Sequence, residues 1–214
     1  LKTLPVKTVS IDKVEADDII AYLSKSVINH PRDKSFIISS DKDFLQLVSE
    51  NVIVYRPMEK EYYTPKTVMD KYKISPHNFI LHKTLLGDNS DKIKGVKGLG
   101  EKGLLKKFPE LIEKDMCWDD ILDICENKMS DHAVYARIIH GQDDLEKNYK
   151  IMDLTNPMLS KEDKEWLDEV VSSKELSYHP DQFVAMYNED QIGGLIRNVE
   201  FWVKDCFENL VIKK

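Results

Sequence analysis

The chain has 214 residues, a formal net charge of −7, 42% hydrophobic residues and 32% charged residues, a composition typical of a globular protein with one large domain or two small ones. It contains no apolar run near the roughly 20 residues that a membrane span requires. It also has no signal-peptide pattern at its start, so we expect no association with a membrane. Its three cysteines lack paired spacing, which favours a reducing intracellular setting over a disulfide framework.

Short strands and helices alternate in the first part of the chain. We predict a strand at residues 5–10 and a helix at residues 16–28, where apolar residues recur at helical spacing. Short apolar runs predict strands at residues 35–39 and 52–55, with a short helix at residues 44–48 between them. Strand, helix and strand in this order indicate a parallel sheet, whose ligands gather at the carboxyl ends of the strands.

The rest of the chain has the pattern of a helical protein. Thr64 before Pro65 and Ser75 before Pro76 predict helix starts, because a hydroxyl can cap the first turn and proline suits the first helical position. Ser160 with Asp163 resembles a capping box. Further helices are expected at residues 131–147, 160–171 and 180–209.

Seven acidic side chains stand in three short clusters within the first 91 residues: Glu15, Asp17, Asp18, Asp41, Asp43, Asp88 and Asp91. The first cluster opens a predicted helix and the second ends a predicted strand. The third has a spacing of three, which puts both side chains on one helix face. Carboxylates that meet need a cation, and hard divalent ions such as Mg²⁺ take oxygen ligands.

Each acidic cluster alone has an ordinary explanation as a helix cap, a turn or a solvated helix face. Their order, followed directly by a glycine-rich turn at residues 93–100, favours a shared metal site beside amides and lysines that suit a phosphate. From Lys92 to Lys107 there are six lysines and one glutamate. A basic stripe in an acidic chain is typical of a protein that touches DNA at one place, and the combination indicates phosphodiester hydrolysis.

Residues 14–18, 38–47 and 87–100 together resemble the 5′-nuclease family. That family includes flap endonucleases, the 5′→3′ exonuclease domain of bacterial DNA polymerase I, and the phage 5′-exonucleases and RNase H of replication. The resemblance is strong from about residue 11 to residue 108. The family's pattern begins before Leu1, so the resemblance implies an amino-terminal portion, with a metal-ligand aspartate and a helical arch, that this sequence lacks.

The fold that the resemblance implies is α/β. Residues 1–72 would be the carboxy-terminal part of a parallel-sheet nuclease core of the PIN-like, 5′-nuclease type, which is therefore partial. Residues 73–156 would be a helix–three-turn–helix DNA-binding region that carries two further metal ligands. Residues 157–214 would be a helical extension of unknown role.

The same resemblance implies roles for the site residues. Glu15, Asp17, Asp18 and Asp41 would serve a first metal ion, and Asp43, Asp88 and Asp91 a second. The two ions are expected to be Mg²⁺, with Mn²⁺ able to substitute, and the same seven acids are the expected catalytic residues. At the hairpin, the carbonyls of Val96 and Leu99 would hold K⁺. DNA phosphates would meet Lys92, Lys94, Gly95, Val96, Lys97, Gly98, Leu99, Gly100 and Lys102.

The implied activity is that of a metal-dependent 5′ nuclease, which removes primers and flaps by a two-metal mechanism during replication or repair. Its partners would be a duplex with a 5′ flap or an RNA–DNA hybrid, and its setting the cytoplasm of a bacterium or of a phage-infected host. The aromatic residues of the last part of the chain either pack a core or dock a single-stranded DNA-binding or replisome protein. These residues are Trp166, Phe201, Trp202 and Phe207.

Two alternatives to an active 5′ nuclease stay open. In the first, the chain is a non-catalytic subunit or fragment that binds DNA junctions and needs a separate amino-terminal part. In the second, it is a PIN-type ribonuclease, which uses a similar acid-lined α/β sheet. The glycine hairpin after the third acidic cluster disfavours this second alternative.

Overall fold

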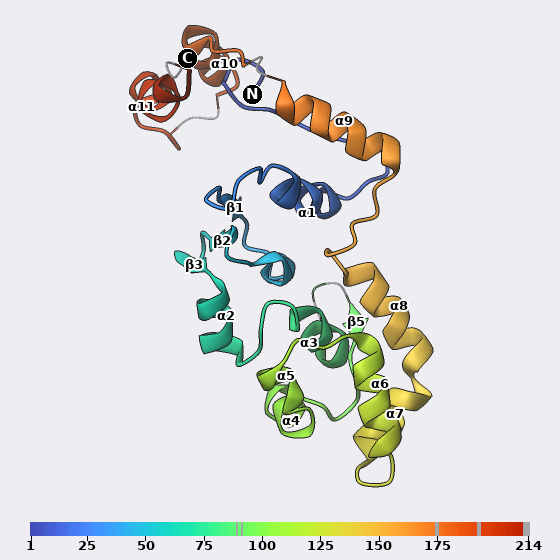
Figure 1. The fold of residues 1–214 in the computed structure, drawn as a ribbon. Helices are drawn as coiled ribbons and strands as arrows, with labels where there is room; N and C mark the ends of the chain where they lie inside the picture. The colour runs from blue at the N-terminus through green and yellow to red at the C-terminus, as the bar shows by residue number, and fades with distance from the viewer. Residues whose placement is uncertain (89, 91, 174–175, 192–193, 212–214) are drawn as a thin grey trace. The chain divides into compact units, whose positions relative to one another are not determined.

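The computed structural model describes residues 1–88, 90, 92–173, 176–191 and 194–211. The chain forms two compact units. One is Glu15–Leu159, and the other consists of the segments Leu1–Val14 and Ser160–Lys214. Figure 1 labels the helices and strands of both units.

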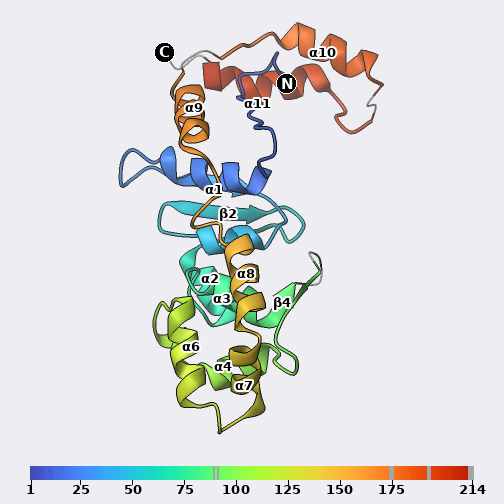
Figure 2. The ribbon, with the colours of Figure 1, turned by 90° about the vertical axis from the view of Figure 1, so that its right-hand side faces the viewer.

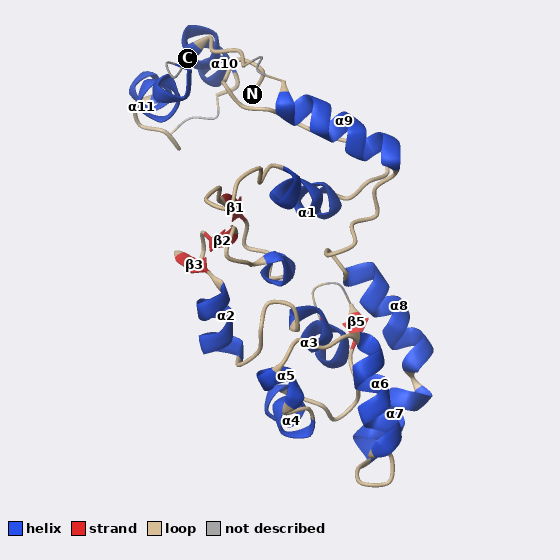
Figure 3. Ribbon diagram, in the orientation of Figure 1, coloured by secondary structure: helices blue, strands red, loops and turns tan. Residues whose placement is uncertain are grey.

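A small mixed sheet lies in the Glu15–Leu159 unit (Figure 3). Its strands are β1 (Ser35–Ile38), β2 (Val52–Arg56) and β3 (Glu61–Tyr63), in the order β1-β2-β3. β1 pairs in parallel with β2, whereas β3 returns antiparallel along β2. The 3₁₀-helix η1 (Asp43–Leu47) joins β1 to β2, and α1 (Ala16–Ser26) packs against β1. The predicted order of strand, helix and parallel strand is confirmed, and β3 adds a strand that the sequence pattern did not indicate.

Helices make up the rest of this unit. They are α2 (Pro65–Tyr72), α3 (Phe79–Leu86), α4 (Glu101–Lys107), α5 (Glu110–Glu113), α6 (Trp118–Asn127), α7 (Ala133–His140) and α8 (Gln142–Met152). Between α3 and α4, the short strands β4 (Gly87–Asp88) and β5 (Ile93–Lys94) pair antiparallel. Helix α3 is the central element, because it contacts η1, α4, β4 and α8, and Figure 2 shows α8 beside it.

The two helix starts predicted at proline have different outcomes. Thr64 caps α2 as predicted, and its hydroxyl accepts a hydrogen bond of 3.3 Å from an amide in the first turn. The helix predicted from Pro76 begins later, at Phe79. The buried side chain of Asn78 donates to the Leu111 carbonyl at 2.9 Å, so the residues before Phe79 form a turn that packs on the α5 segment.

One hydrophobic core unites the sheet with the helices. Leu45 of η1, Val54 of β2, Leu81 and Leu85 of α3, and Ile138 of α7 are all fully buried in the same cluster. Because these side chains come from both parts of the unit, the strands and the helices depend on each other for their burial.

Two long helices predicted from the sequence are each divided in the structure. The stretch at residues 131–147 forms α7 and α8, which meet at Gly141. Glycine is a weak helix former, which explains the break. The stretch at residues 180–209 forms α10 (Pro180–Glu189) and α11 (Val199–Val211).

The unit of Leu1–Val14 and Ser160–Lys214 has a small core of its own. Leu4, Phe183, Tyr187 and Val203 form its buried cluster, and Trp202 and Phe207 are partly buried against it. Trp202 and Phe207 are therefore packing residues, the first of the two readings that the sequence allowed. Phe201 is exposed, and so is Trp166 of α9 (Lys161–Ser172).

The amino-terminal segment contacts the end of α9 and forms no strand. The strand predicted at residues 5–10 is wrong, because these residues form no strand and belong to neither described sheet. Instead, the Lys7 ammonium donates to the carbonyls of Val170 and Val171 at 2.5 and 2.6 Å, at the end of α9. The capping box predicted at Ser160 is confirmed at the other end of this helix.

Candidate metal centre and nucleic-acid interface

Asp43 and Asp88, which are far apart in the sequence, meet at one cation. Asp43 begins η1, and Asp88 lies on β4 directly after α3. The ammonium of Lys83, on the last turn of α3, pairs with Asp43 Oδ1 and lies 2.8 Å from Asp88 Oδ2. Lys83 is only 5% exposed, so a buried ammonium meets two partly buried carboxylates.

Local backbone geometry brings the two carboxylates to Lys83. The Asp43 amide donates to Asp41 Oδ1 at 2.9 Å, and the Asp41 amide donates to the Ser39 hydroxyl at 3.1 Å. These bonds turn the chain sharply at the carboxyl end of β1. At the end of α3, Gly87 adopts a φ of +80°, which is open to glycine and reverses the chain so that Asp88 faces the helix it follows.

The protonation of the three groups reflects both burial and pairing. Burial raises the pKa of Asp43 to about 6, although Lys83 lowers it and the neighbouring carboxylate of Asp41 raises it further. Burial also acts to raise the pKa of Asp88, but hydrogen bonds from Lys83 and Ser90 hold that pKa well below its ordinary value. Burial acts to lower the pKa of Lys83, yet its two carboxylate partners leave it raised. The ammonium therefore stays charged, as a cation between acids should.

The remaining predicted acids are less closely gathered. Glu15 is the exposed N-cap residue of α1, and Asp17 and Asp18 follow in its first turn. Asp18 Oδ1 accepts a hydrogen bond of 2.9 Å from the Met158 amide, and Asp91 lies outside the described residues. Within the part of the chain that the structure describes, no group of three or more His, Cys, Asp or Glu side chains is arranged to hold a metal ion. The seven-acid site stays a prediction.

Arg56 supports the acidic turn, which is the segment of residues 40–43, and the sequence analysis did not indicate this role. It ends β2, is 6% exposed, and donates from its Nη2 to the Ser40 carbonyl at 2.6 Å. Its guanidinium also pairs with Glu59. Because Ser40 directly precedes Asp41, the buried arginine fixes the segment that carries both Asp41 and Asp43.

The glycine-rich hairpin packs tightly onto the end of α3. A Cβ on Gly95 would lie 2.1 Å from the Leu86 carbonyl carbon, and one on Gly87 would lie 2.3 Å from the Gly95 nitrogen. The Val96 amide donates to the Leu85 carbonyl at 2.8 Å. These contacts join the hairpin directly to the turn that holds Asp88.

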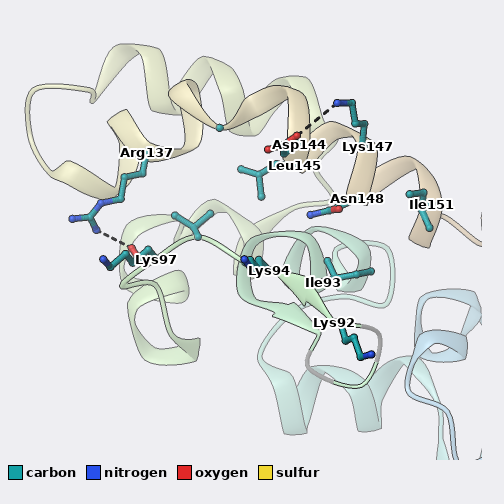
Figure 4. A pocket seen from close by; sticks show the side chains of 13 residues that line it. Lys92, Ile93, Lys94, Lys97, Arg137, Asp144, Leu145, Lys147, Asn148 and Ile151 are labelled. Carbon is teal, nitrogen blue, oxygen red and sulfur yellow. Dashed lines mark hydrogen bonds and ion pairs between the residues drawn. The ribbon is translucent and has the colours of Figure 1, made fainter.

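A groove of about 790 Å³ separates the hairpin from α7 and α8. Figure 4 shows the lysines of the hairpin on one side and the side chains of α8 on the other. Five cationic side chains line the groove against one carboxylate, Asp144. The cationic residues are Lys92, Lys94, Lys97, Arg137 and Lys147.

Arg137 and Lys147 are groove residues that the sequence analysis missed. Arg137 donates from Nη1 to the Lys97 carbonyl at 2.8 Å, a bond drawn in Figure 4. The Lys147 ammonium lies 3.6 Å from Asp144 Oδ1, which is three residues earlier on α8. Both residues come from the stretch predicted as one helix, and its sequence carries no sign that it would fold against the hairpin.

The predicted DNA-binding residues divide into two groups. Those that line the groove are Lys92, Lys94, Gly95, Val96 and Lys97. Gly98, Leu99, Gly100 and Lys102 lie outside its lining. Leu99 is 8% exposed and its amide donates to the Val96 carbonyl at 3.0 Å, so this part of the hairpin is anchored in the core.

A model of the family described as 5′-3′ exonuclease, N-terminal resolvase-like domain, matches residues 1–73. A 5′-3′ exonuclease of Aquifex aeolicus is 33% identical over 169 residues, which are 76% of this chain and 54% of that protein. This chain is homologous to the 5′-nucleases. The flap endonuclease Xni of Colwellia psychrerythraea is 38% identical over 96 residues, 45% of this chain and 33% of that protein.

The fold is that of the 5′-nucleases as well. The flap endonuclease of bacteriophage T5, solved as a pseudo-enzyme–product complex with DNA and metal ions, matches with a TM-score of 0.63 and 22% identity. The match covers 77% of this chain and 61% of that protein. The predicted α/β 5′-nuclease fold is confirmed.

The chain spans about half the length of the Aquifex relative that it matches. No helix within the described residues combines the length and the apolar character that crossing a bilayer requires.

Proposed function

We propose that this chain carries metal-binding and duplex-binding elements of a 5′ nuclease that hydrolyses phosphodiester bonds in DNA or RNA–DNA hybrids. The observation that carries the proposal is the convergence of Asp43 and Asp88 on a single cation, the Lys83 ammonium. A basic groove begins only a few residues along the chain from Asp88. Acidic oxygens for a metal and cations for phosphates are the two needs of metal-assisted phosphodiester cleavage.

The carboxylates of Asp41, Asp43 and Asp88 have the chemistry of a site for Mg²⁺ or Mn²⁺. Asp43 and Asp88 present oxygens to one positive charge, and Asp41 adjoins Asp43 through a hydrogen bond. Carboxylate oxygens are the ligands that these hard ions take. When bound, a pair of such ions supplies a hydroxide nucleophile and stabilises the leaving oxygen. We assign Asp41, Asp43 and Asp88 to this site, with Glu15, Asp17, Asp18 and Asp91 completing it.

The chain's other groups bind and orient the duplex. The groove cations would meet phosphates without reading sequence. Arg137 holds the Lys97 carbonyl, so the exposed side chains of Lys94 and Lys97 project from a fixed turn. The packing of Gly95 on the end of α3 keeps the phosphate contacts at a constant distance from Asp88.

The finer parts of the proposal concern substrate and setting. A groove that binds phosphates fits the removal of flaps and primers in replication or repair. The substrate would be a 5′-flap duplex or an RNA–DNA hybrid, and the location would be the cytoplasm of a bacterium or of a phage-infected host. A K⁺ ion at the Val96 and Leu99 carbonyls remains compatible with the hairpin, because the Val96 oxygen that accepts the Leu99 amide has a second lone pair.

Cleavage of a labelled 5′-flap duplex in Mg²⁺ tests the metal assignment. Asp88→Asn keeps the size of the side chain and removes its charge, and we expect turnover to fall by more than about 100-fold while duplex affinity changes little. Asp123→Asn, on the exposed face of α6, is the matched control. Equal turnover in the two variants would refute the assignment.

The salt dependence of duplex binding tests the groove. Replacing both Lys94 and Lys97 by glutamine should reduce the slope of log affinity against log salt by about 2, since each lost phosphate contact removes about 0.9. The same double change at Lys34 and Lys66, exposed lysines outside the groove, should leave the slope unaltered. An unaltered slope in the Lys94 and Lys97 variant would show that the hairpin does not belong to the duplex-binding surface.

A non-catalytic role in binding DNA junctions is the second candidate. The observation that favours it is the contrast between the basic groove, which the described residues line with five cations, and the acids of the described residues, among which no group of three or more is arranged to hold a metal ion. Duplex binding without cleavage by the 214-residue chain, in both Mg²⁺ and Mn²⁺, would select this candidate over the nuclease.

A further inference from the structure

Lys83 occupies the place where the carboxylates of Asp43 and Asp88 would hold a metal ion. Its side chain is 6% exposed, and its ammonium is within ion-pair distance of both Asp43 and Asp88. The helix that carries it is packed on one side against η1, which begins with Asp43, and on the other against α8. The position of the ammonium is therefore set by the central helix of the unit.

The reason for a lysine at this position is electrostatic. Two carboxylates brought together out of water repel each other and lose hydration, and a buried charge without a partner is strongly destabilising. The ammonium neutralises half of this negative charge and donates a hydrogen bond to each acid. A divalent cation between the same oxygens would also neutralise the two carboxylates, so the Lys83 ammonium and the divalent cation compete for one site.

We propose that Lys83 is a resident counter-ion that holds Asp43 and Asp88 together until a divalent metal displaces it, and that this displacement sets the metal affinity of the site. The inference rests on the proposed function, because it takes Asp43 and Asp88 as metal ligands. It assigns Lys83 a positioning role, in which the residue acts on the metal site through the two carboxylates.

The structure provides room for the displaced ammonium. Lys83 and Asp88 lie on the wall of a cavity of about 360 Å³, whose lining also includes Glu101 and Lys42. A lysine side chain has four rotatable bonds and moves at little cost when a polar destination is available. Glu101 offers a carboxylate on that wall, so the ammonium can leave the acids and still face a negative charge.

Metal binding followed by isothermal calorimetry with Mn²⁺ is the first test. Lys83→Met removes the competing charge and keeps the length of the side chain, and the variant should bind Mn²⁺ about tenfold more tightly than the native chain or tighter still. Its melting temperature in EDTA should be lower than that of the native chain, and Mn²⁺ should raise it by a larger increment. Lys83→Arg keeps the charge and should return the affinity toward the native value.

Lys128→Met is the matched control. Lys128 also pairs with a carboxylate, with its ammonium 3.6 Å from Glu110, but it is the C-cap residue of α6 and does not belong to the elements that carry Asp43 and Asp88. Its loss should leave Mn²⁺ affinity unchanged. Equal Mn²⁺ affinity in native chain, Lys83→Met and Lys128→Met would overturn the inference while leaving the metal site in place. An absence of Mn²⁺ binding in all of them would overturn the proposed function itself.

Chemical modification of the native chain tests the displacement without relying on a variant that folds. Reductive methylation should spare Lys83 in EDTA, because its ammonium is buried and paired, and should reach it in saturating Ca²⁺. Peptide mass spectrometry reads the modification at each lysine, with exposed Lys34 as an internal reference. Protection of Lys83 that is the same in EDTA and in Ca²⁺ would overturn the inference.

Discussion

Two parts of the Glu15–Leu159 unit differ in how far they bury their apolar side chains. Around α3, Leu81 and Leu85 are fully buried, and the hairpin touches the helix end through backbone atoms. At β1, the end strand of the described sheet, Phe36 is 55% exposed and Ile38 is 72% exposed. A groove of about 270 Å³ runs between this strand and α1.

The difference separates a part that buries its apolar side chains from a part that leaves several of them exposed. The α3 region contains Lys83, Asp88 and the hairpin that lines the phosphate groove, and its positions are fixed by packing, which is how a site gains precise geometry. The β1 edge keeps unpaired strand backbone and apolar side chains in contact with solvent, a combination that favours pairing with another strand. The proposed metal site lies where the two parts meet, because Asp41 and Asp43 follow β1 whereas Asp88 follows α3.

Thiol labelling gives the largest expected contrast. Cys125 is buried in the core, and burial raises the pKa of its thiol to about 12, whereas Cys117 is exposed. With iodoacetamide at neutral pH, Cys125 should react at least about 1,000-fold more slowly, because its labelling requires the core to open. A cysteine introduced by Ile38→Cys should react as fast as Cys117. Similar labelling rates at Cys125 and at the cysteine of Ile38→Cys would show that the core and the β1 edge do not differ in accessibility.

Gln46→Ala should strongly destabilise the closed region. The buried Gln46 side chain donates to the Met152 carbonyl at 3.0 Å and accepts from the Leu154 amide at 3.0 Å, which ties η1 to the end of α8. Its removal leaves two buried backbone groups unpaired, and we expect a loss of about 4 kcal/mol in urea unfolding. Gln142→Ala, at the exposed start of α8, should change stability by less than about 0.5 kcal/mol.

Gly95→Ala should loosen the junction between α3 and the hairpin. The added Cβ meets backbone atoms of Leu86 and Gly87 that have no room to yield, so we expect a loss of about 3 kcal/mol and weaker duplex binding. Gly100 has no atom within 4 Å of its added Cβ, and Gly100→Ala should cost at most about 1 kcal/mol as a changed N-cap. Equal effects at the two glycines would show that the hairpin is not held by close packing.

Ile38→Lys should have the smallest effect on folding. The side chain is already in solvent, so the free energy of unfolding should change by less than about 0.5 kcal/mol, while light scattering should show less self-association because a charge protects a strand edge. Its neighbour Ile37 faces the core at 6% exposure, and Ile37→Lys should prevent normal folding. Unchanged self-association of the Ile38→Lys chain would show that the β1 edge does not drive self-association.

Local patterns in the sequence were enough to predict several elements. The strands β1 and β2, helix α1, the Thr64 cap and the Ser160 capping box depend on neighbouring residues, and each appears where the pattern indicated it. Helix ends were less accurate where a distant partner intervened. Asn78 delays the start of α3 through its bond to Leu111, and such a contact has no sign in the local sequence.

The sequence by itself determined which acids and lysines the chain carries, how they are spaced, and the parallel strand order that places Asp41 and Asp43 at a strand end. Only the tertiary structure decided that Lys83 lies between Asp43 and Asp88, that Arg56 holds the turn before them, and that Arg137 faces the hairpin. The physical reason is that helical and strand periodicity act over a few residues. The meeting of charges from separate elements depends instead on how the helices pack around one core.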